Sequence, residues 1–358
     1  MAIDKITTPA IADDAVTNAK VSYNNNQFRN IIINGDMSIA QRATSVTGIQ
    51  SSGYRTVDRF KQTFSGSLVG TWTQSQSTDV PTGQGFSTSL KLDCTTADAS
   101  LAANESLKIQ QRFEGQNLQY LKKGTSSAES LTLSFWVKSA KTGTYICELV
   151  DNDNGRQISK SYTISSANTW EKKTITYPGD TTGALDNDNA QSLVLNWWLV
   201  AGSNFSSGTL STTWTSTTDA NRAVGNVDLA DSTDNDWYVT GVQLEAGTSA
   251  SDFEFLPVDV NLERCQRYLQ FIDAEYFVVP RFNNGTGKPL GQLTFPKTMR
   301  ASPTGTATGT FLSSTGYAGT PSFYNIQPVC LALEGANSIA ANVVEYLHGG
   351  IFKMEAEL

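Results

Sequence analysis

The sequence predicts an all-β protein whose centre is an antiparallel β-sandwich, or jelly roll. Two observations carry this prediction. Short runs of β-branched or alternating apolar and polar residues recur between residues 28 and 257, with Gly, Asn and Asp turns between them. Helical patterns are few. Short strands at regular spacing are typical of sandwiches and barrels.

We expect three parts along the chain. Residues 1–27 form an extended N-terminal arm, and residues 28–257 form the jelly-roll domain. Residues 258–358 form a short linking helix and a smaller C-terminal β-domain at the distal tip. Pro257 and the best helical pattern of the sequence mark the second boundary.

In the arm, Ile6, Ile11, Val16 and Val21 recur every five residues. This interval fits neither the helical period nor the strand period. One such segment cannot bury its aliphatic side chains, whereas three copies around a common axis could. A disordered tail is the alternative.

The central domain is predicted to contain several strands. They cover residues 29–33, 131–137, 144–150, 162–164, 171–177, 192–200 and 237–244. Residues 131–150 should form a hairpin, and Asp151 to Gly155 the next tight turn. Two short helical turns are expected over residues 105–113 and 117–121.

After residue 257 a helix is predicted over residues 259–269, with a capping residue at its start. Leu262, Cys265, Leu269 and Ile272 lie at helical spacing. Short strands should follow at 276–279, 290–295 and 305–311. The last hairpin pairs residues 343–347 with 351–358 and turns at His348-Gly349-Gly350. Its amphipathic final strand should hold the C-terminus in place.

The amino-acid composition argues against two classes of partner, nucleic acids and membranes. Charged residues make up 17% of the chain, Ser and Thr number 78, and the net charge is −8. An acidic, hydroxyl-rich protein is a poor partner for nucleic acids or anionic membranes. No apolar stretch is long enough for a transmembrane helix, and the first residues lack the pattern of a signal peptide. We therefore predict no nucleic-acid partner and no membrane insertion.

We predict no cofactor, no metal and no catalytic residue. The four cysteines are far apart and should be free thiols, and His348 is the one histidine of the sequence. Acidic turns at 151–155, 186–188 and 231–236 are ordinary turn chemistry. A calcium loop starting at Asp151 would need Glu at its twelfth position, where Tyr162 stands.

Several motifs, in order, resemble a family of phage tail-fibre and receptor-binding proteins. They are Asn30 to Met37 with Gln41-Arg42, Asp58-Arg59-Phe60, Ser134 to Ser139, Val242 to Gly247 with Asp252-Phe253-Glu254, Leu262 to Tyr268, and Phe295 to Pro303. Residues 6–20 resemble the attachment segment of cyanophage fibres. The resemblance implies a homotrimer in the virion, with the arm docked to a tail or baseplate protein and the distal β-domains at the host surface.

The central domain is also similar to carbohydrate-binding modules of jelly-roll fold, which open with an Asn-Gly-x-Phe-Glu pattern. Met37 and Ser38 replace Phe and Glu here. In many such modules this Glu helps to hold a structural calcium ion. Arg42, Arg59 and Glu245 are charged residues inside apolar motifs, and a buried ion pair that locks the first and last strands would explain them.

Aromatic residues are the candidates for glycan binding, because sugar faces stack on aromatic rings. The selected residues are Trp72, Trp198 and Trp214, with Asn283, Asn284 and Tyr317 in loops of the C-terminal domain. Of Trp197 and Trp198, at least one must face away from the core. Core or intersubunit packing is the alternative for each tryptophan.

Three functions remain open. The first is a trimeric fibre that recognises a host-surface polysaccharide without cleaving it. The second is a purely structural virion adapter or decoration protein. The third is a fibre-borne glycan hydrolase, which the scarcity of histidine and the absence of a β-helix repeat disfavour.

Overall fold

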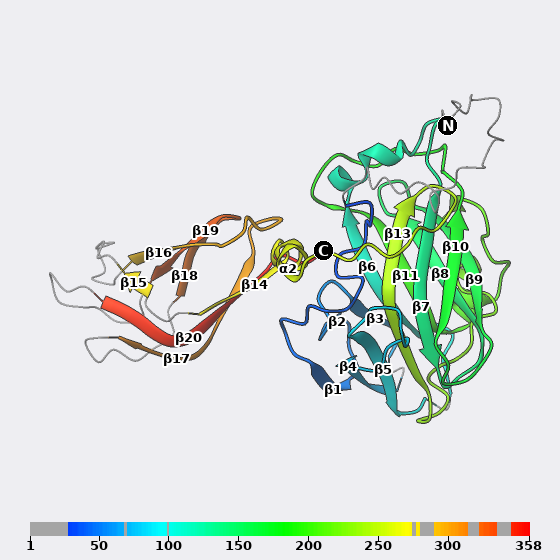
Figure 1. The fold of residues 1–358 in the computed structure, drawn as a ribbon, viewed down its shortest axis with the longest axis horizontal. Coiled ribbons are helices and arrows are strands. Elements are labelled where there is room, and N and C mark those ends of the chain that lie inside the picture. Colours follow the sequence, from blue (N-terminus) through cyan, green and yellow to red (C-terminus); the bar gives the residue numbers. More distant parts are fainter. Residues whose placement is uncertain are drawn as a thin grey trace, which may run out of the picture.

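The computed structural model describes residues 28–67, 70–98, 100–273, 277–279, 290–313, 322–334 and 345–358. Figure 1 shows two lobes, a large β-sandwich and a smaller C-terminal lobe, with helix α2 (Val258–Gln266) between them. The prediction of an all-β chain with an antiparallel sandwich and a short linking helix is confirmed. Among the residues described, no helix has the length and apolar character to cross a membrane.

Two antiparallel sheets form the sandwich. The six-stranded sheet has the order β1 (Ser45–Ile49), β4 (Thr71–Ser77), β5 (Ser89–Thr96), β13 (Asp236–Ala246), β7 (Leu131–Ser139) and β10 (Glu171–Tyr177). The seven-stranded sheet has the order β12 (Thr215–Ser216), β9 (Arg156–Ile164), β8 (Gly143–Asp151), β11 (Gln191–Ala201), β6 (Ser106–Glu114), β3 (Lys61–Ser65) and β2 (Gly53–Tyr54). Short helical turns connect them at η2 (Gly115–Asn117), η3 (Gln119–Leu121), α1 (Ser203–Ser206) and η4 (Asp219–Asn221).

Alternation along the strands fills the core between the sheets. On β7, Leu133, Phe135 and Val137 are fully buried and belong to the main hydrophobic cluster, together with Trp197 of β11 and Trp237 of β13. The residues between them on each strand point to the outer face of their sheet. Each sheet therefore has one face in the core and one outer face, on which a site can form.

Two predictions about the secondary structure of the sandwich are wrong. Strands β7 and β8 do not form a hairpin, because the chain crosses from one sheet to the other between them. Strand β8 pairs instead with β9 through the turn at Asp151 to Gly155. Residues 105–113 are not helical but form most of β6, where Leu107 and Ile109 alternate into the core. The helical turn predicted over 117–121 is present as η3.

Residues 29–33 were expected to form a strand and do not. This segment runs beside β13, but the Asn30 side chain takes the place of part of a backbone ladder. Leu244 donates its N–H to Asn30 Oδ1 at 3.0 Å, and Asn30 Nδ2 donates to the Val242 carbonyl at 3.0 Å. One backbone bond, from Ile31 N–H to the Leu244 carbonyl at 2.9 Å, accompanies them.

The C-terminal lobe contains two small sheets. Its strands are β14 (Leu269–Asp273), β15 (Phe277–Val279), β16 (Leu290–Thr294), β17 (Thr304–Ser313), β18 (Ser322–Ile326), β19 (Cys330–Glu334) and β20 (Glu345–Glu355). Strand β20 pairs with β14, β15 and β17, and β19 pairs with β16 and β18. Phe352 and Met354 of β20 are fully buried in the core of this lobe.

Two predictions in this lobe need correction. The helix ends at Gln266 rather than at residue 269, and Pro257 precedes it without a side-chain cap. Leu269 and Ile272 belong to β14, because pairing with β20 outweighs their helical spacing. The final hairpin is also wrong, since His348, Gly349 and Gly350 lie inside the continuous strand β20.

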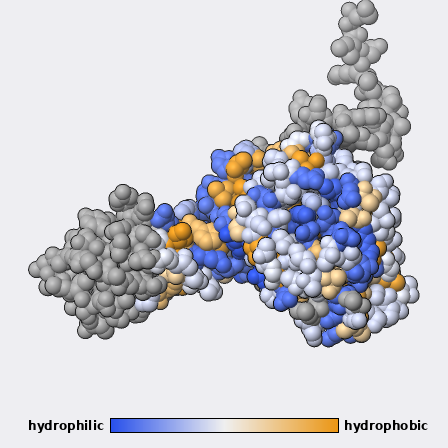
Figure 2. Space-filling view, turned by 90° about the horizontal axis from the view of Figure 1, so that it is seen from below, coloured by the Kyte–Doolittle hydropathy of each residue, from blue (hydrophilic) through white to orange (hydrophobic). Residues whose placement is uncertain are grey.

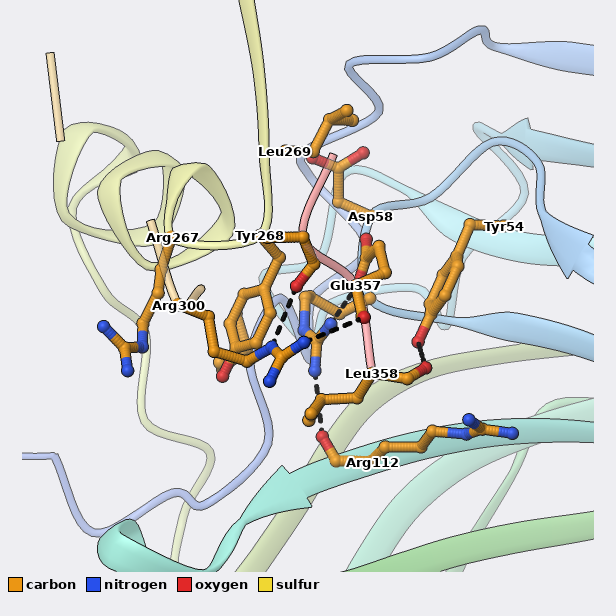
Figure 3. A network of polar contacts seen from close by, with 12 residues as sticks. Tyr54, Asp58, Arg112, Arg267, Tyr268, Leu269, Arg300, Glu357 and Leu358 are labelled. Atoms are coloured by element: carbon orange, nitrogen blue, oxygen red, sulfur yellow. Dashed lines mark hydrogen bonds and ion pairs between the residues drawn. The ribbon is translucent and has the colours of Figure 1, made fainter. Parts of the chain in front are cut away.

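Buried ion pairs join the two lobes (Figure 3). Arg42 contacts Glu355 at 2.7 Å and Glu357 at 3.0 Å. Arg59 pairs with Glu357 and stacks on the Tyr268 ring, 3.4 Å from its centroid. Arg42 and Arg59 thus pair with residues at the end of the chain, and the predicted pairing of these arginines with Glu245 is wrong.

Glu245 has different contacts. Its carboxylate lies 3.8 Å from Arg29 and accepts hydrogen bonds from the N–H and hydroxyl groups of Ser251, at 2.9 and 2.7 Å. The predicted ion pair between the start of the domain and its last strand is therefore present for Glu245, and the partner of Glu245 is Arg29. All four cysteines are free thiols, and Cys94, Cys147 and Cys265 are buried.

Candidate functional site

The outer face of the six-stranded sheet carries a row of alternating cationic and aromatic side chains. Strand register places Lys91 of β5 beside Tyr238 of β13, and Tyr238 beside Lys138 of β7. Trp170, directly before β10, is the next neighbour of Lys138. The Lys138 ammonium lies 4.1 Å from the Tyr238 ring centroid and 5.7 Å from that of Trp170. We call these four residues and Trp136 the aromatic platform.

Asp79 fixes one end of the platform. It accepts a hydrogen bond from the Trp170 indole N–H at 2.9 Å and pairs with the Lys138 ammonium. Burial acts to raise the pKa of Asp79, but the hydrogen bonds from Lys138 and Trp170 prevail and lower it. The carboxylate therefore stays charged at neutral pH and holds both the lysine and the indole in one orientation.

Trp136 lies two residues along β7 from Lys138 and therefore on the same outer face. Its cross-strand neighbours are Thr240 of β13 and Lys172 of β10. Both Trp136 and Trp170 are partly exposed, and Lys172 is exposed. Two partly exposed indole rings beside the exposed Lys172 ammonium and the Asp79 carboxylate are suited to stack on a sugar and to bind its hydroxyls.

None of the predicted glycan-binding residues that the structure describes belongs to the platform. Trp72, on β4, has no exposed surface and packs in the main core, so its selection as a glycan-binding residue is wrong. Trp214 is partly buried; its indole N–H donates to the Pro178 carbonyl at 2.8 Å, and the Lys123 ammonium lies 5.3 Å from its ring centroid. The remaining predicted residues lie outside the described residues. They are Asn283, Asn284, Tyr317, Ile6, Ile11, Val16 and Val21.

Trp198 needs a separate correction. The prediction that one of the Trp197–Trp198 pair faces away from the core is confirmed, because Trp198 lies on the outer face of the seven-stranded sheet. The ring is nevertheless fully buried, under Phe205 and Ala223. Its indole N–H donates to Glu148 Oε2 at 3.0 Å. A glycan therefore has no access to it.

The sequence did contain a signal for the platform. Trp136 occupies the polar phase of its strand, with Thr132, Ser134 and Lys138. An aromatic residue in that phase is on the outer face by alternation alone. Trp170 carried a weaker signal, because it lies in a turn before β10 and reaches the platform only through the fold.

No protein-family model and no curated protein matches this sequence. Among solved structures, the chain is similar to the enzymatically active domain of tailspike protein 4 of bacteriophage CBA120, with 14% identity and a TM-score of 0.31. That alignment covers 61% of this chain but 21% of the tailspike chain. The chain is also similar to a putative sugar binding protein from Bacteroides thetaiotaomicron, with 11% identity, a TM-score of 0.33, and coverage of 61% and 99%.

A further similar structure is TmCBM61 in complex with beta-1,4-galactotriose. Here the identity is 10% and the TM-score 0.29, and the alignment covers 61% of this chain and 99% of the other. Similarity at this level identifies no family for the chain. The candidate site is therefore defined by its own residues and geometry.

Proposed function

We propose that this protein is a tail-fibre component of a phage virion that recognises a host-surface glycan without cleaving it. The observation that carries the proposal is the aromatic platform, where Trp136 and Trp170 keep part of their rings exposed beside Lys138 and Asp79. The resemblance of the sequence motifs to phage receptor-binding proteins supports the same function. A homotrimer docked through residues 1–27 to a tail or baseplate protein completes the proposal.

Contact area and multivalency support a glycan rather than a small polar metabolite. A platform gives stacking area but little enclosure, so one site binds weakly, with a dissociation constant on the order of 1 mM. Three copies in a trimer, and several trimers on a particle, would raise the avidity by a factor of roughly 10² to 10⁴. Particles should then adsorb strongly even though a single chain binds weakly.

The test is adsorption of the purified protein to host cells and to extracted lipopolysaccharide. The double variant Trp136→Ala, Trp170→Ala should lose at least tenfold in binding, because both stacking surfaces are removed. Trp214→Ala is the matched control on another part of the surface and should leave binding unchanged. If Trp214→Ala removes binding and the platform variant does not, the site is at Trp214.

The alternative is a structural adapter or decoration protein. It would be favoured if wild-type protein and intact particles bind neither cells nor polysaccharide. Catalysis is a separate question, which the same samples answer: incubation with host polysaccharide should release no reducing ends. Release that a single carboxylate-to-alanine change abolishes would contradict the non-cleaving proposal.

A further inference from the structure

A pocket of about 510 Å³ lies where the sandwich meets the linking helix. Three segments line it: residues 28–33, the end of β6 with the turns η2 and η3, and helix α2 with Tyr268 directly after it. The aromatic platform contributes no residue to this pocket. It is therefore a second, independent candidate for ligand binding, of a size that suits one or two sugar residues.

Glu114 of β6 is the carboxylate that lines the pocket, and its oxygens are already occupied. Arg267, directly after α2, donates to it from Nε at 2.8 Å and from a terminal nitrogen at 2.6 Å. The Tyr268 hydroxyl donates at 2.5 Å and Gln116 Nε2 at 2.6 Å. Figure 3 shows Arg267 and Tyr268 at this junction. Arg267 and Glu114 thus neutralise each other.

Arg264, one turn earlier on α2, has no such partner. Its guanidinium makes a hydrogen bond of 3.2 Å to the Asn30 carbonyl, and within the described part of the chain it forms no ion pair. The nearby Glu254 carboxylate instead accepts the N–H groups of Phe28 and Asn30, each at 2.8 Å.

The pKa values show the same contrast. Burial lowers the pKa of Arg264, and the nearby Glu254 compensates only in part. The hydrogen bonds that Arg267 donates to Glu114 raise the pKa of Arg267. Arg264 is therefore a largely buried cation that lines the pocket without an ion pair in the described part of the chain, and an anionic ligand group would compensate it.

The rim of the pocket has the features of a sugar site. The rings of Phe28 and Tyr120 are about half exposed, at 55% and 50%. Gln116 and Asn117 are exposed beside them and offer amide groups to hydroxyls. Figure 2 shows hydrophobic residues on the surface around the neck between the two lobes.

We propose that this junction pocket binds a sugar residue that carries a carboxylate, such as a hexuronic acid. Arg264 would bind the carboxylate, and Phe28 and Tyr120 would stack on the sugar ring. The proposal rests on the proposed glycan-binding function and assigns it a second subsite, with a preference for anionic sugars. On a chain with a net charge of −8, this preference requires a local unpaired cation such as Arg264.

The experiment is a calorimetric titration of the full chain with trigalacturonate, with neutral galactotriose and with galactose 6-phosphate. Trigalacturonate should bind at least tenfold more tightly than galactotriose. Arg264→Gln should remove this preference while leaving the neutral sugar unaffected, and Arg264→Lys should retain part of it, because Lys keeps the charge but loses the planar fork. Arg55→Gln is the matched control, since among the described residues the hydrogen bonds of the Arg55 side chain stay within its own turn, to Ser51 and Ser52.

Several outcomes would overturn the proposal. These are equal affinity for the charged and neutral trisaccharides, an unchanged preference in folded Arg264→Gln protein, or binding of galactose 6-phosphate alone. Should Arg264→Gln fail to fold, Tyr120→Ala at the exposed rim should reduce trigalacturonate affinity about fivefold or more, and an unchanged affinity would overturn the proposal. The platform variant Trp136→Ala, Trp170→Ala should keep trigalacturonate binding, so loss of either site is distinguishable from loss of the other.

Discussion

Both outer faces of the sandwich carry tryptophan and lysine side chains, but these side chains differ in their exposure and in their partners. On the six-stranded sheet, Trp136 and Trp170 stay partly exposed. On the seven-stranded sheet, Trp198 faces outward as well, but Phe205 and Ala223 bury it completely. An outward-facing aromatic residue is therefore available to a ligand only where no connecting segment covers the sheet.

The lysines differ in the same way. Lys138 on the open face pairs with Asp79. Lys108 on the covered face lies 4.5 Å from the Trp198 ring centroid, and within the described residues it forms no ion pair. Burial and, to a smaller extent, the nearby Arg222 lower the pKa of Lys108 to about 8, although Glu148 opposes the shift. Among the described residues, the lysine of the covered face is thus buried without an ion pair, whereas the lysine of the open face has one.

The largest expected effect is on stability, and it tests the contrast directly. Trp198→Ala should destabilise the protein by about 3 to 5 kcal/mol, because it empties a fully buried site. It also removes a hydrogen-bond donor from buried Glu148. Trp136→Ala, on the open face, should cost about 1 kcal/mol or less. Urea unfolding of the two variants against wild type measures both values.

Trp198→Phe serves as the control, because it keeps an aromatic ring and loses only the indole donor. It should fall between wild type and Trp198→Ala. Equal destabilisation by Trp136→Ala and Trp198→Ala would contradict the distinction between an open and a covered face.

The next effect concerns pH and Lys108. Its native pKa of about 8 lies below the ordinary value of 10.5, so the charged form is disfavoured in the folded protein. Below pH 8 the cost of burying the charge is fully present. It decreases as the pH rises from 8 towards 10.5, where the unfolded chain also loses its proton. Wild-type stability should therefore rise in this window relative to a variant without the amine.

Lys108→Met keeps the packing of the stem and removes the charge. At pH 7 it should stabilise the protein by about 1 to 2 kcal/mol, since the lost cation–π contact offsets part of the removed burial cost. Above pH 8 the advantage should shrink. Unfolding midpoints of both proteins at pH 7, 8 and 9.5 measure this, and an advantage that stays constant across the range would show that Lys108 does not titrate there.

The sequence predicted most of the strands that follow residue 130 in the sandwich, because alternation is a local property, but it predicted none of β1 to β5 and assigned most of β6 to a helical turn. It placed 171–177 at the bounds of β10 and required that at least one of Trp197 and Trp198 face away from the core, which is Trp198 in the structure. It could not predict that a connecting segment buries Trp198, because the Ser- and Thr-rich sequence of residues 202–218 has no periodicity. Because this cover could not be predicted, Trp198 was selected as a binding residue. Trp136, which also faces outward, was not selected.

Pairing errors had a different cause. The sequence shows that β7 and β8 are consecutive strands. Consecutive strands can pair with each other or lie in different sheets, and contacts with residues distant in the sequence decide which of the two occurs. Leu269 and Ile272 fit a helix by spacing and join β14 because β20, some 80 residues later, pairs with them. Arg264 could not be identified as unpaired from the sequence, since its neighbours come from three separate segments.

The smallest effect tests the ion pair of the open face. Asp79→Asn removes the charge that pairs with Lys138 and keeps an oxygen for the Trp170 indole. The Asp79 side chain is 45% exposed, so solvent screens the pair, and the change should cost less than about 1 kcal/mol. Because the native pKa of Asp79 is lowered, this contribution should be present above the ordinary aspartate pKa and lost as the pH falls through the native value. It should also decrease in high salt. Unfolding of Asp79→Asn and wild type at pH 7, with and without added salt, and again near pH 2 gives the comparison. A loss of several kcal/mol at pH 7 would mean that this face is as enclosed as the one over Trp198, and the platform would then offer no open surface to a glycan.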